Sequence, residues 1–452
     1  MMDTEGGSEV HVSSIDGEIA KVPENDQVTL TIRQGKYVDI EEPGIVLQVS
    51  FEGFTRDTQP GDILVIDGGM ATLQVLKTRG PEVLCEVVDP GLILPRASIN
   101  IRRDGNLVRS TDAFMPVICA KDWNDIDMAI QQGVDFIAVS FVRSADVLDN
   151  LRSYINSKTS KMIQIVSKIE AYESIANLED IVAASDAVMV ARGDLGAQIP
   201  VHHVPIVQKH IVDLCRRANK AVIVASQLLE SMHTLPTPTR AEVADITEAC
   251  RQRTDALMLS GESAIGSYPL RSLDVLRTVA TRAEQWVRDE KDQGHYNIQQ
   301  LQLPEVATST DGRISENLCE AAATIADNLD ARAIFCFTKR GVMANLLSRM
   351  RPNAPIFAFC NTQEVRQQLS MRWGITPFKL DFSNDPETNI ARTIMLLRSR
   401  DLVSPGDLIV IVSDITSIQP MLVNSNGDEG IQGDDSLSSS TVRSVQVRHI
   451  PY

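Results

Sequence analysis

The sequence predicts an α/β fold: most of an eight-stranded β/α barrel, which follows a β-rich segment and precedes a smaller α/β domain. Two observations predict this class. Apolar runs of strand length alternate with helical patterns from near residue 114 onward, and short alternating segments broken by Gly, Pro and Asp fill the chain before that point. The 452 residues suffice for roughly two to four domains.

Residues 12–108 are predicted to be all-β. Segments such as QVTLTI and DILVID have the alternation of a half-buried strand, and turn-forming residues separate them. This rhythm differs from that of the residues that follow.

The barrel prediction depends on apolar runs that recur with helical patterns between them. These runs are FIAVSFV (136–142), IQIVSKIE (163–170), AVMVARGD (187–194), AVIVASQ (221–227) and ALMLSGE (256–262). Between two of them, VPIVQKHIVDLC predicts a helix with Val207, Ile211 and Leu214 on one stripe. Strands that are buried on both faces and alternate with helices indicate a parallel sheet, and this spacing fits most of a β/α barrel.

A second α/β domain is predicted after a polar, irregular stretch at 290–312 that has the character of a linker. The segment ISENLCEAAATIADNL (314–329) predicts a helix, and AIFCFT, PIFAFC and DLIVIVSD predict strands. Residues 424–441 are acidic and rich in Gly and Ser, which predicts disorder. The apolar alternation VQVRHI near the end predicts an edge strand.

Polar residues follow every strand of the predicted barrel. They are Ser140 and Arg143, Lys168 and Glu170, Arg192 and Asp194, Ser226 and Gln227, and Ser260 and Glu262. The carboxyl ends of barrel strands converge on one mouth, which is where active sites of such folds lie. We therefore expect these side chains to surround a shared pocket.

Glu170 and Asp194 are the best candidates for a metal site. Two carboxylates on neighbouring strands suit Mg²⁺, which completes its shell with water and substrate oxygens. Lys168 beside them would supply a positive charge for a phosphoryl group or a developing enolate. A Lys-x-Glu pair alone is more often a local salt bridge. The convergence of strand ends that carry Lys, Glu and Asp favours a functional site.

Composition and charge exclude several functions. A net charge of −17 and a pI near 4.9 argue against binding nucleic acid or an anionic membrane through bulk charge. We find no apolar run long enough to span a membrane. The first twenty residues contain neither Lys nor Arg nor an apolar block, so we expect no transit segment within them.

The runs SKIE, MVARGDLG, ASQLLESM, PTPTRAEVAD and LMLSGESAIGSYP, in this order, closely resemble the pyruvate kinase family. The segment MMDTEGGSE is similar to the family's Asp-Thr-Lys-Gly-Pro-Glu segment. Details such as DTEG, GAQIP and the ending SVQVRHIP look most like the plastid α-type (isozyme A) of plants. The resemblance extends over nearly the whole chain.

The resemblance implies transfer of a phosphoryl group from phosphoenolpyruvate to ADP, giving pyruvate and ATP in glycolysis, with Mg²⁺ and K⁺. It implies that Lys168 stabilises the transition state and that Glu170 and Asp194 hold Mg²⁺. Substrate contacts would come from Lys168, Gly193, Asp194 and Ser226, the last at the family's Thr position, and K⁺ contacts from Asp3 and Thr4.

The resemblance also implies a domain plan, a setting and partners. Residues 1–11 and 109–290 would form the barrel, 12–108 a β-barrel lid, and 313–452 the C-terminal domain. The chain would act in a plastid, as a homo- or hetero-oligomer with other pyruvate kinase subunits. By this likeness it begins inside the third barrel strand, so the first two strands and the family's Arg-Leu-Asn-Phe-Ser-His-Gly segment are expected to be missing.

Several positions depart from the family pattern. Glu5 replaces the usual Lys, His11 stands where the family has Arg, and Pro90 stands where a lid Lys is common. The segment TKRGVM (338–343) lacks the Ser-Gly-Arg-Ser pattern of relatives that a sugar bisphosphate activates. Glu5, His11 and Pro90 favour one alternative, a catalytically weak or inactive subunit that regulates a hetero-oligomer, whereas the intact Lys168, Glu170 and Asp194 oppose it. Another barrel enzyme that acts on enolates through Mg²⁺ is a more distant alternative, since it would not explain PTPTRAE.

Overall fold

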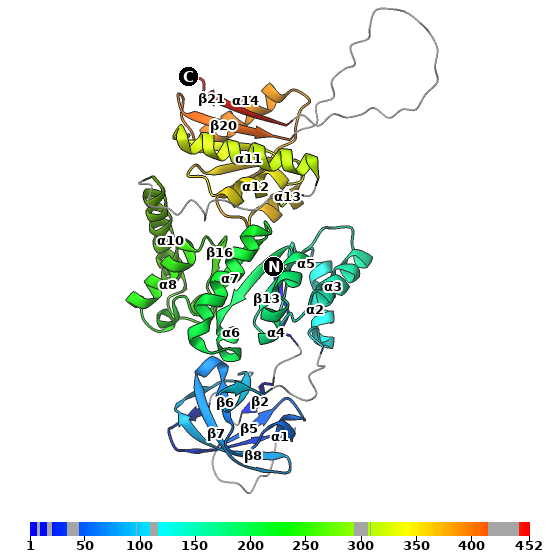
Figure 1. The fold of residues 1–452 in the computed structure, drawn as a ribbon, viewed down its shortest axis with the longest axis vertical. Coiled ribbons are helices and arrows are strands. Elements are labelled where there is room, and N and C mark those ends of the chain that lie inside the picture. The colour runs from blue at the N-terminus through cyan, green and yellow to red at the C-terminus, as the bar shows by residue number, and fades with distance from the viewer. Residues whose placement is uncertain are drawn as a thin grey trace, which may run out of the picture. The chain divides into compact units, whose positions relative to one another are not determined.

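The computed structural model describes residues 1–6, 10–15, 20–33, 45–95, 97–108, 116–292, 306–307, 309–414 and 443–452. They form two units (Figure 1). One comprises Met1–Cys215 with Val222–Ala283, and the other Arg216–Ala221 with Glu284–Tyr452.

A curled parallel sheet is the centre of the first unit. Its strands, in spatial order, are β1 (Met2–Asp3), β12 (Phe136–Val139), β13 (Gln164–Ile169), β14 (Ala187–Ala191), β15 (Ala221–Ala225) and β16 (Ala256–Met258). Every residue of β12, β14 and β15 is buried, as expected for strands covered on both faces. The five apolar runs of the sequence thus form neighbouring strands of a partial β/α barrel, and the prediction of the fold class is confirmed.

Helices follow the strands of this sheet in the β/α rhythm. They are α2 (Ala120–Gln131), α3 (Ala145–Lys158), α4 (Tyr172–Ala176), α5 (Leu178–Ala184), α6 (Arg192–Gln198), α7 (Val204–Arg217), α8 (Arg240–Arg251), α9 (Gly261–Ala264) and α10 (Pro269–Asp292), with the 3₁₀ turns η2 (Val201–His203) and η3 (Glu230–His233). The helix α8 begins at a capping box, in which Thr239 and Glu242 bond each other's backbone N–H groups. This cap occupies the PTPTRAE segment.

The β-rich segment forms its own sheet, drawn in blue in Figure 1. Its strands, in spatial order, are β11 (Asn106–Leu107), β10 (Ile99–Arg103), β6 (Ile63–Ile66), β7 (Ala71–Arg79), β8 (Glu82–Asp89), β4 (Gln27–Thr31), β5 (Ile45–Val49) and β2 (Val12–Ile15). A separate pair, β3 (Ala20–Val22) and β9 (Gly91–Ile93), the short helix α1 (Phe54–Asp57) and the turn η1 (Asp67–Gly69) complete it. An antiparallel bridge between His11 and Ser98 closes the sheet into a barrel.

Gly91→Ala is expected to destabilise this β-barrel by about 1–3 kcal/mol, because a Cβ at Gly91 would lie 1.8 Å from the carbonyl oxygen of Met70. Backbone atoms form this obstacle, so no side-chain rotation relieves it. Urea unfolding measures the loss of stability, and Leu92→Ala, at the next and partly exposed position, is the matched control. Equal stability of the two variants would contradict the close approach.

The second unit is a sheet of five strands with helices on its faces. Its strands, in spatial order, are β19 (Ile375–Lys379), β18 (Ile356–Cys360), β17 (Ala333–Phe337), β20 (Leu408–Ser413) and β21 (Ser444–His449). Its helices are α11 (Thr310–Asn328), α12 (Val342–Met350), α13 (Gln363–Leu369) and α14 (Pro386–Arg398). Two apolar clusters pack on the sheet, one of them containing five phenylalanines. The expected edge strand near the end is β21, antiparallel to β20.

The structure corrects one detail and leaves another outside the described residues. The irregular stretch expected at 290–312 is shorter than predicted, because α10 continues to Asp292 and α11 already begins at Thr310. The disorder predicted for 424–441 concerns residues that are not described.

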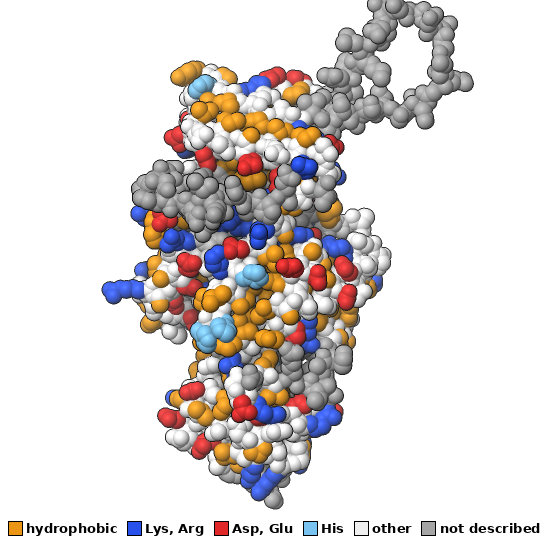
Figure 2. Space-filling model, viewed as in Figure 1, with side chains coloured by type: hydrophobic (Ala, Val, Ile, Leu, Met, Phe, Trp, Pro, Cys, Tyr) orange, Lys and Arg blue, Asp and Glu red, His pale blue; other side chains and the backbone are white. Residues whose placement is uncertain are grey.

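The helices and the charged surface of the described residues can be compared with what a membrane or a polyanion would require. None of the helices in the described ranges combines the length and the apolar character that crossing a membrane requires. On the face drawn in Figure 2, acidic and basic side chains are interspersed among apolar and uncharged ones.

Candidate active site

Lys168 and Glu170 lie at the carboxyl end of β13, as predicted. Glu170 is fully buried, and the side chain of Lys168 is 13% exposed. The ammonium nitrogen of Lys168 lies 2.9 Å from Glu170 Oε1 and 3.4 Å from Asp3 Oδ2, and it donates a 2.8 Å hydrogen bond to Ser140 Oγ. The lysine is thus held between the ends of three neighbouring strands, β1, β12 and β13.

Glu170 is fixed from a second side. Its Oε2 accepts a 2.8 Å hydrogen bond from the backbone N–H of Phe141, which follows β12. Phe141 has a φ of 53°, an uncommon value for a residue with a side chain. The other carboxylate oxygen of Glu170, Oε1, is buried and has no well-directed hydrogen bond beyond the ion pair with Lys168.

The buried charges at this edge act on one another. Burial opposes the charged form of Lys168, but the carboxylates of Glu170, Asp3 and Asp194 outweigh it and raise the pKa of Lys168. Burial raises the pKa of Glu170 to about 7, although Lys168 lowers it. Burial likewise raises the pKa of Asp194, which Lys168 lowers and Asp67 raises further. Lys168 is therefore a stable cation beside two carboxyl groups whose pKa values are raised.

Beside Lys168 and Glu170 lie three more predicted residues: Gly193, Asp194 and Ser226. Gly193 and Asp194 belong to the first turn of α6, directly after β14, and Ser226 directly follows β15. A Cβ placed on Gly193 would lie 3.6 Å from Ser226 Cβ and 3.8 Å from Ser226 Oγ. The absence of a side chain at Gly193 thus keeps the space next to Ser226 open.

Asp3 and Thr4 lie on the other side of Lys168. Thr4 is buried, and its Oγ1 and carbonyl oxygen accept hydrogen bonds from the N–H and hydroxyl of Ser140, at 2.9 and 2.8 Å. The side chain of Asp3 is half exposed. All seven residues predicted for the site therefore lie at the carboxyl-terminal ends of the strands of the parallel sheet.

Three contributors could not be assigned from the sequence. The sequence places Ser140 at a strand end but does not show that it bridges Thr4 and Lys168. Glu262 is fully buried and accepts hydrogen bonds from the N–H groups of Leu229 and Ser260, which join the ends of β15 and β16. Asp67, in the turn η1 of the β-barrel, acts on Asp194; the sequence offers only its Asp-Gly turn as a signal.

The donor set fits Mg²⁺. Within the described ranges no three His, Cys, Asp or Glu side chains cluster as a metal site. The candidate donors are the two neighbouring carboxylates of Glu170 and Asp194. Mg²⁺ needs only one or two carboxylates, and the buried Glu170 Oε1 is an acceptor that such a cation would satisfy. For K⁺, Asp3 and Thr4 offer oxygen atoms, of which those of Thr4 already accept hydrogen bonds from Ser140.

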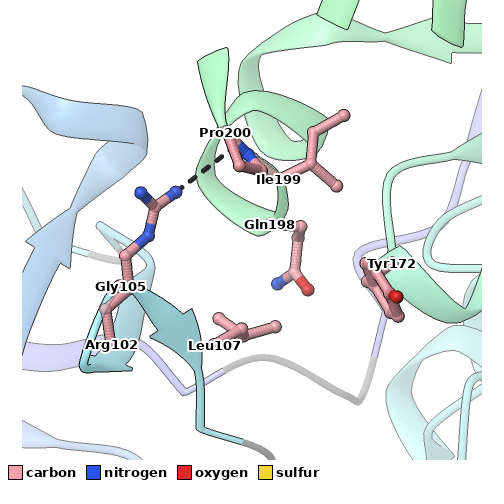
Figure 3. A pocket seen from close by; sticks show the side chains of 7 residues that line it. All are labelled: Arg102, Gly105, Leu107, Tyr172, Gln198, Ile199 and Pro200. Atoms are coloured by element: carbon pink, nitrogen blue, oxygen red, sulfur yellow. Dashed lines mark hydrogen bonds between the residues drawn. The ribbon is translucent and has the colours of Figure 1, made fainter. Parts of the chain in front are cut away.

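A cavity of about 250 Å³ lies between the β10–β11 hairpin and the end of α6 (Figure 3). Arg102 donates hydrogen bonds to the carbonyl oxygens of Ala197 and Ile199, at 2.9 and 3.4 Å, and Gln198 donates one to Asn100. In Figure 3, Tyr172 faces Gln198 across the cavity. The β-barrel thus contacts the last turn of the helix whose first turn carries Asp194.

The positions that depart from the family pattern have ordinary contacts. Glu5 forms a 3.0 Å ion pair with Lys121, and its N–H donates to Asp122 Oδ1. His11 contacts the hydroxyl of Ser50 at 3.2 Å through Nδ1. Pro90 lies between β8 and β9 and is exposed.

Comparison with known proteins agrees with this geometry. A profile of the pyruvate kinase barrel domain matches residues 1–273, and a profile of the pyruvate kinase alpha/beta domain matches residues 316–424. The chain is 50% identical to the chloroplastic pyruvate kinase isozyme A of Ricinus communis, over 94% of this chain and 72% of the relative. Identity to isozyme A of Nicotiana tabacum is also 50%, over 94% of this chain and 70% of the relative.

A crystal structure of a pyruvate kinase from Cryptosporidium parvum superimposes with a TM-score of 0.73 and 26% identity, covering 99% of this chain and 83% of that chain. The family that the sequence motifs indicated is therefore confirmed along both units. The chain belongs to the pyruvate kinase family of phosphotransferases.

Proposed function

We propose that the chain transfers a phosphoryl group from phosphoenolpyruvate to ADP, giving pyruvate and ATP. The observation that carries the proposal is the meeting of Lys168, Glu170 and Asp194 at the ends of neighbouring parallel strands. Phosphoryl transfer requires neutralisation of charge and positioning more than covalent chemistry, and this group supplies both.

Each residue has a distinct role in this proposal. The ammonium group of Lys168, held by Ser140 and Glu170, faces the negative charge of the phosphoryl group while the bond to the enolate oxygen breaks. Glu170 and Asp194 would hold Mg²⁺, which neutralises phosphate oxygens when bound. Gly193, Asp194 and Ser226 form the wall that contacts substrate, and Asp3 and Thr4 would take part in binding K⁺. The β-barrel of residues 12–108 acts as a lid that excludes water.

An assay of the purified full chain tests the function. Formation of pyruvate from phosphoenolpyruvate and ADP is expected to require Mg²⁺, to stop when the metal is chelated, and to resume when Mg²⁺ is added back. Because the relatives of isozyme A type are chloroplastic, we further propose a plastid location, which a fluorescent fusion to the natural full-length protein would test.

A regulatory subunit is the second candidate. Two positions favour it. Glu5 stands where the family has a lysine, and its carboxylate pairs with Lys121; Pro90 stands in the lid where a lysine is common. This candidate predicts no turnover by the chain alone, but a changed rate when it is mixed with an active pyruvate kinase subunit. Persistence of that change in the Lys168→Met chain would favour regulation over catalysis.

Affinity for Mg²⁺ is expected to increase between pH 6 and pH 8. Burial raises the pKa of Glu170 to about 7, so this carboxyl is mostly protonated at pH 6, and a bound cation must displace its proton. One proton with this pKa makes the apparent Kd about tenfold larger at pH 6 than at pH 8. Calorimetric titration at the two pH values measures the ratio, which Glu170→Gln should abolish together with most of the affinity. An affinity in the parent chain that does not depend on pH would contradict the assignment.

A further inference from the structure

The side chain of Arg192 uses all of its hydrogen-bond donors inside the protein. It is the first residue of α6, and its side chain is only 9% exposed. Nε and Nη2 donate to the carbonyl oxygen of Ser226, at 3.1 and 2.8 Å, and Nη2 also donates to that of Gln227, at 3.1 Å. Nη1 donates to Asp245 Oδ1 at 2.7 Å and to Gln208 Oε1 at 3.5 Å. These five contacts equal the number of N–H donors of a guanidinium group.

The two carbonyl groups that Arg192 binds belong to a strained turn. Ser226 has a φ of 70° and Gln227 a φ of 54°, so two successive residues with side chains adopt the left-handed conformation. Each such residue costs of the order of 1 kcal/mol or more and persists only where its surroundings hold it. In this turn the guanidinium group is the partner of both carbonyl oxygens.

The turn determines where Ser226 lies relative to the site. Ser226 directly follows β15, and its side chain lies against Gly193, the residue next to Arg192. The segment that holds the turn is therefore the segment that carries Asp194. Asp245 on α8 fixes the far side of the guanidinium group.

We infer that Arg192 is a positioning residue for substrate: it holds the Ser226–Gln227 turn in its left-handed form and so sets the place of the Ser226 hydroxyl. Arg192 does this through backbone carbonyl groups and does not itself touch substrate. The inference rests on the proposed function, in which Ser226 contacts phosphoenolpyruvate. Lysine cannot reproduce the contacts, because it has a single nitrogen in place of a planar fork.

Steady-state kinetics separate this role from a general structural one. Arg192→Met is expected to raise KM for phosphoenolpyruvate about tenfold or more, with a smaller effect on kcat, because Lys168 and the two acids stay in place. Arg192→Lys should give an intermediate KM. Arg152→Met is the matched control, because Arg152 on α3 also binds a carboxylate and a backbone carbonyl, those of Asp186, just before β14, and of Ala184, at the end of α5. Its KM should equal that of the parent.

A second background tests the backbone mechanism. Glycine adopts the left-handed conformation without strain, so the KM penalty of Arg192→Met should shrink when Gln227→Gly is also present. An equal penalty in both backgrounds would overturn the inference.

Hydrogen exchange at residues 226–229 gives a readout that does not depend on activity. Arg192→Met should accelerate exchange there, and Arg152→Met should not. If the parent chain shows no turnover while this difference persists, the proposed function fails, but Arg192 still holds the Ser226–Gln227 turn. If the parent is active but Arg192→Met changes neither KM nor exchange, the positioning role fails alone.

Discussion

Lys168→Met is expected to lower kcat by about a thousandfold, and it should leave the fold intact. The lysine is the cation nearest the two carboxylates, and its raised pKa keeps it charged at neutral pH. Methionine fills a similar volume without a charge, so the transferring phosphoryl group would lose its fixed positive partner. The coupled formation of pyruvate measures the effect.

Lys161→Met is the matched control for this variant. Lys161 precedes the same strand, β13, and pairs with Asp135 at 3.0 Å. Because it lies at the amino end of that strand, its loss should change kcat less than about threefold. Near-ultraviolet circular dichroism would show whether both variants fold. Equal rates of Lys168→Met and the parent would refute the catalytic assignment.

Arg349→Met is expected to destabilise the second unit by about 3–5 kcal/mol, the usual cost of leaving a buried charge without its partner. The side chains of Arg349 and Glu316 are only 1% and 6% exposed and form an ion pair. Nε and Nη2 of Arg349 also donate to the carbonyl oxygens of Arg216 and Arg217, at 2.9 and 3.2 Å. Among the described residues, methionine would leave the carboxylate of Glu316 with the N–H groups of Val306 and Ala307 as its hydrogen-bond donors.

Tryptophan fluorescence can report the stability of the second unit by itself. The protein has three, and in a Trp123→Phe background only Trp286 and Trp373 remain, both in the second unit. Urea unfolding followed by their fluorescence should shift strongly for Arg349→Met. Arg332→Met, which removes a 61% exposed arginine 3.9 Å from Asp407, should change the free energy of unfolding by less than about 0.5 kcal/mol. Adding Glu316→Gln should recover part of the loss, and a single variant as stable as the control would contradict the prediction.

The strands and the catalytic group were predictable from the sequence for one physical reason. Buried parallel strands appear as continuous apolar runs, and their carboxyl ends lie on the same side of the sheet, so the sequence alone predicts that Lys168, Glu170 and Asp194 lie close together. The strand β19 was not predicted, because Pro377 lies within it and proline argues against a strand. It lies at the edge of its sheet, where proline is tolerated.

Contacts between residues far apart in the chain were not predictable. Arg192 and Asp245 lie 53 residues apart, and each had an ordinary local explanation, one at a strand end and the other inside a helix. Asp67 comes from the inserted β-barrel, and no periodicity reports which of its turns approaches the parallel sheet. The left-handed Ser226–Gln227 turn was not predictable either, since neither residue is glycine.

The helix α6 is only seven residues long. Its first turn carries Asp194, and its last turn receives the hydrogen bonds of Arg102. A helix of seven residues is about 10 Å long and too short to bend, so its first and last turns move together as a rigid body. We therefore expect any shift that a bound cation or anion imposes on the first turn of α6 to reach the β10–β11 hairpin at its last turn, so that filling the site and the position of the β-barrel should depend on each other.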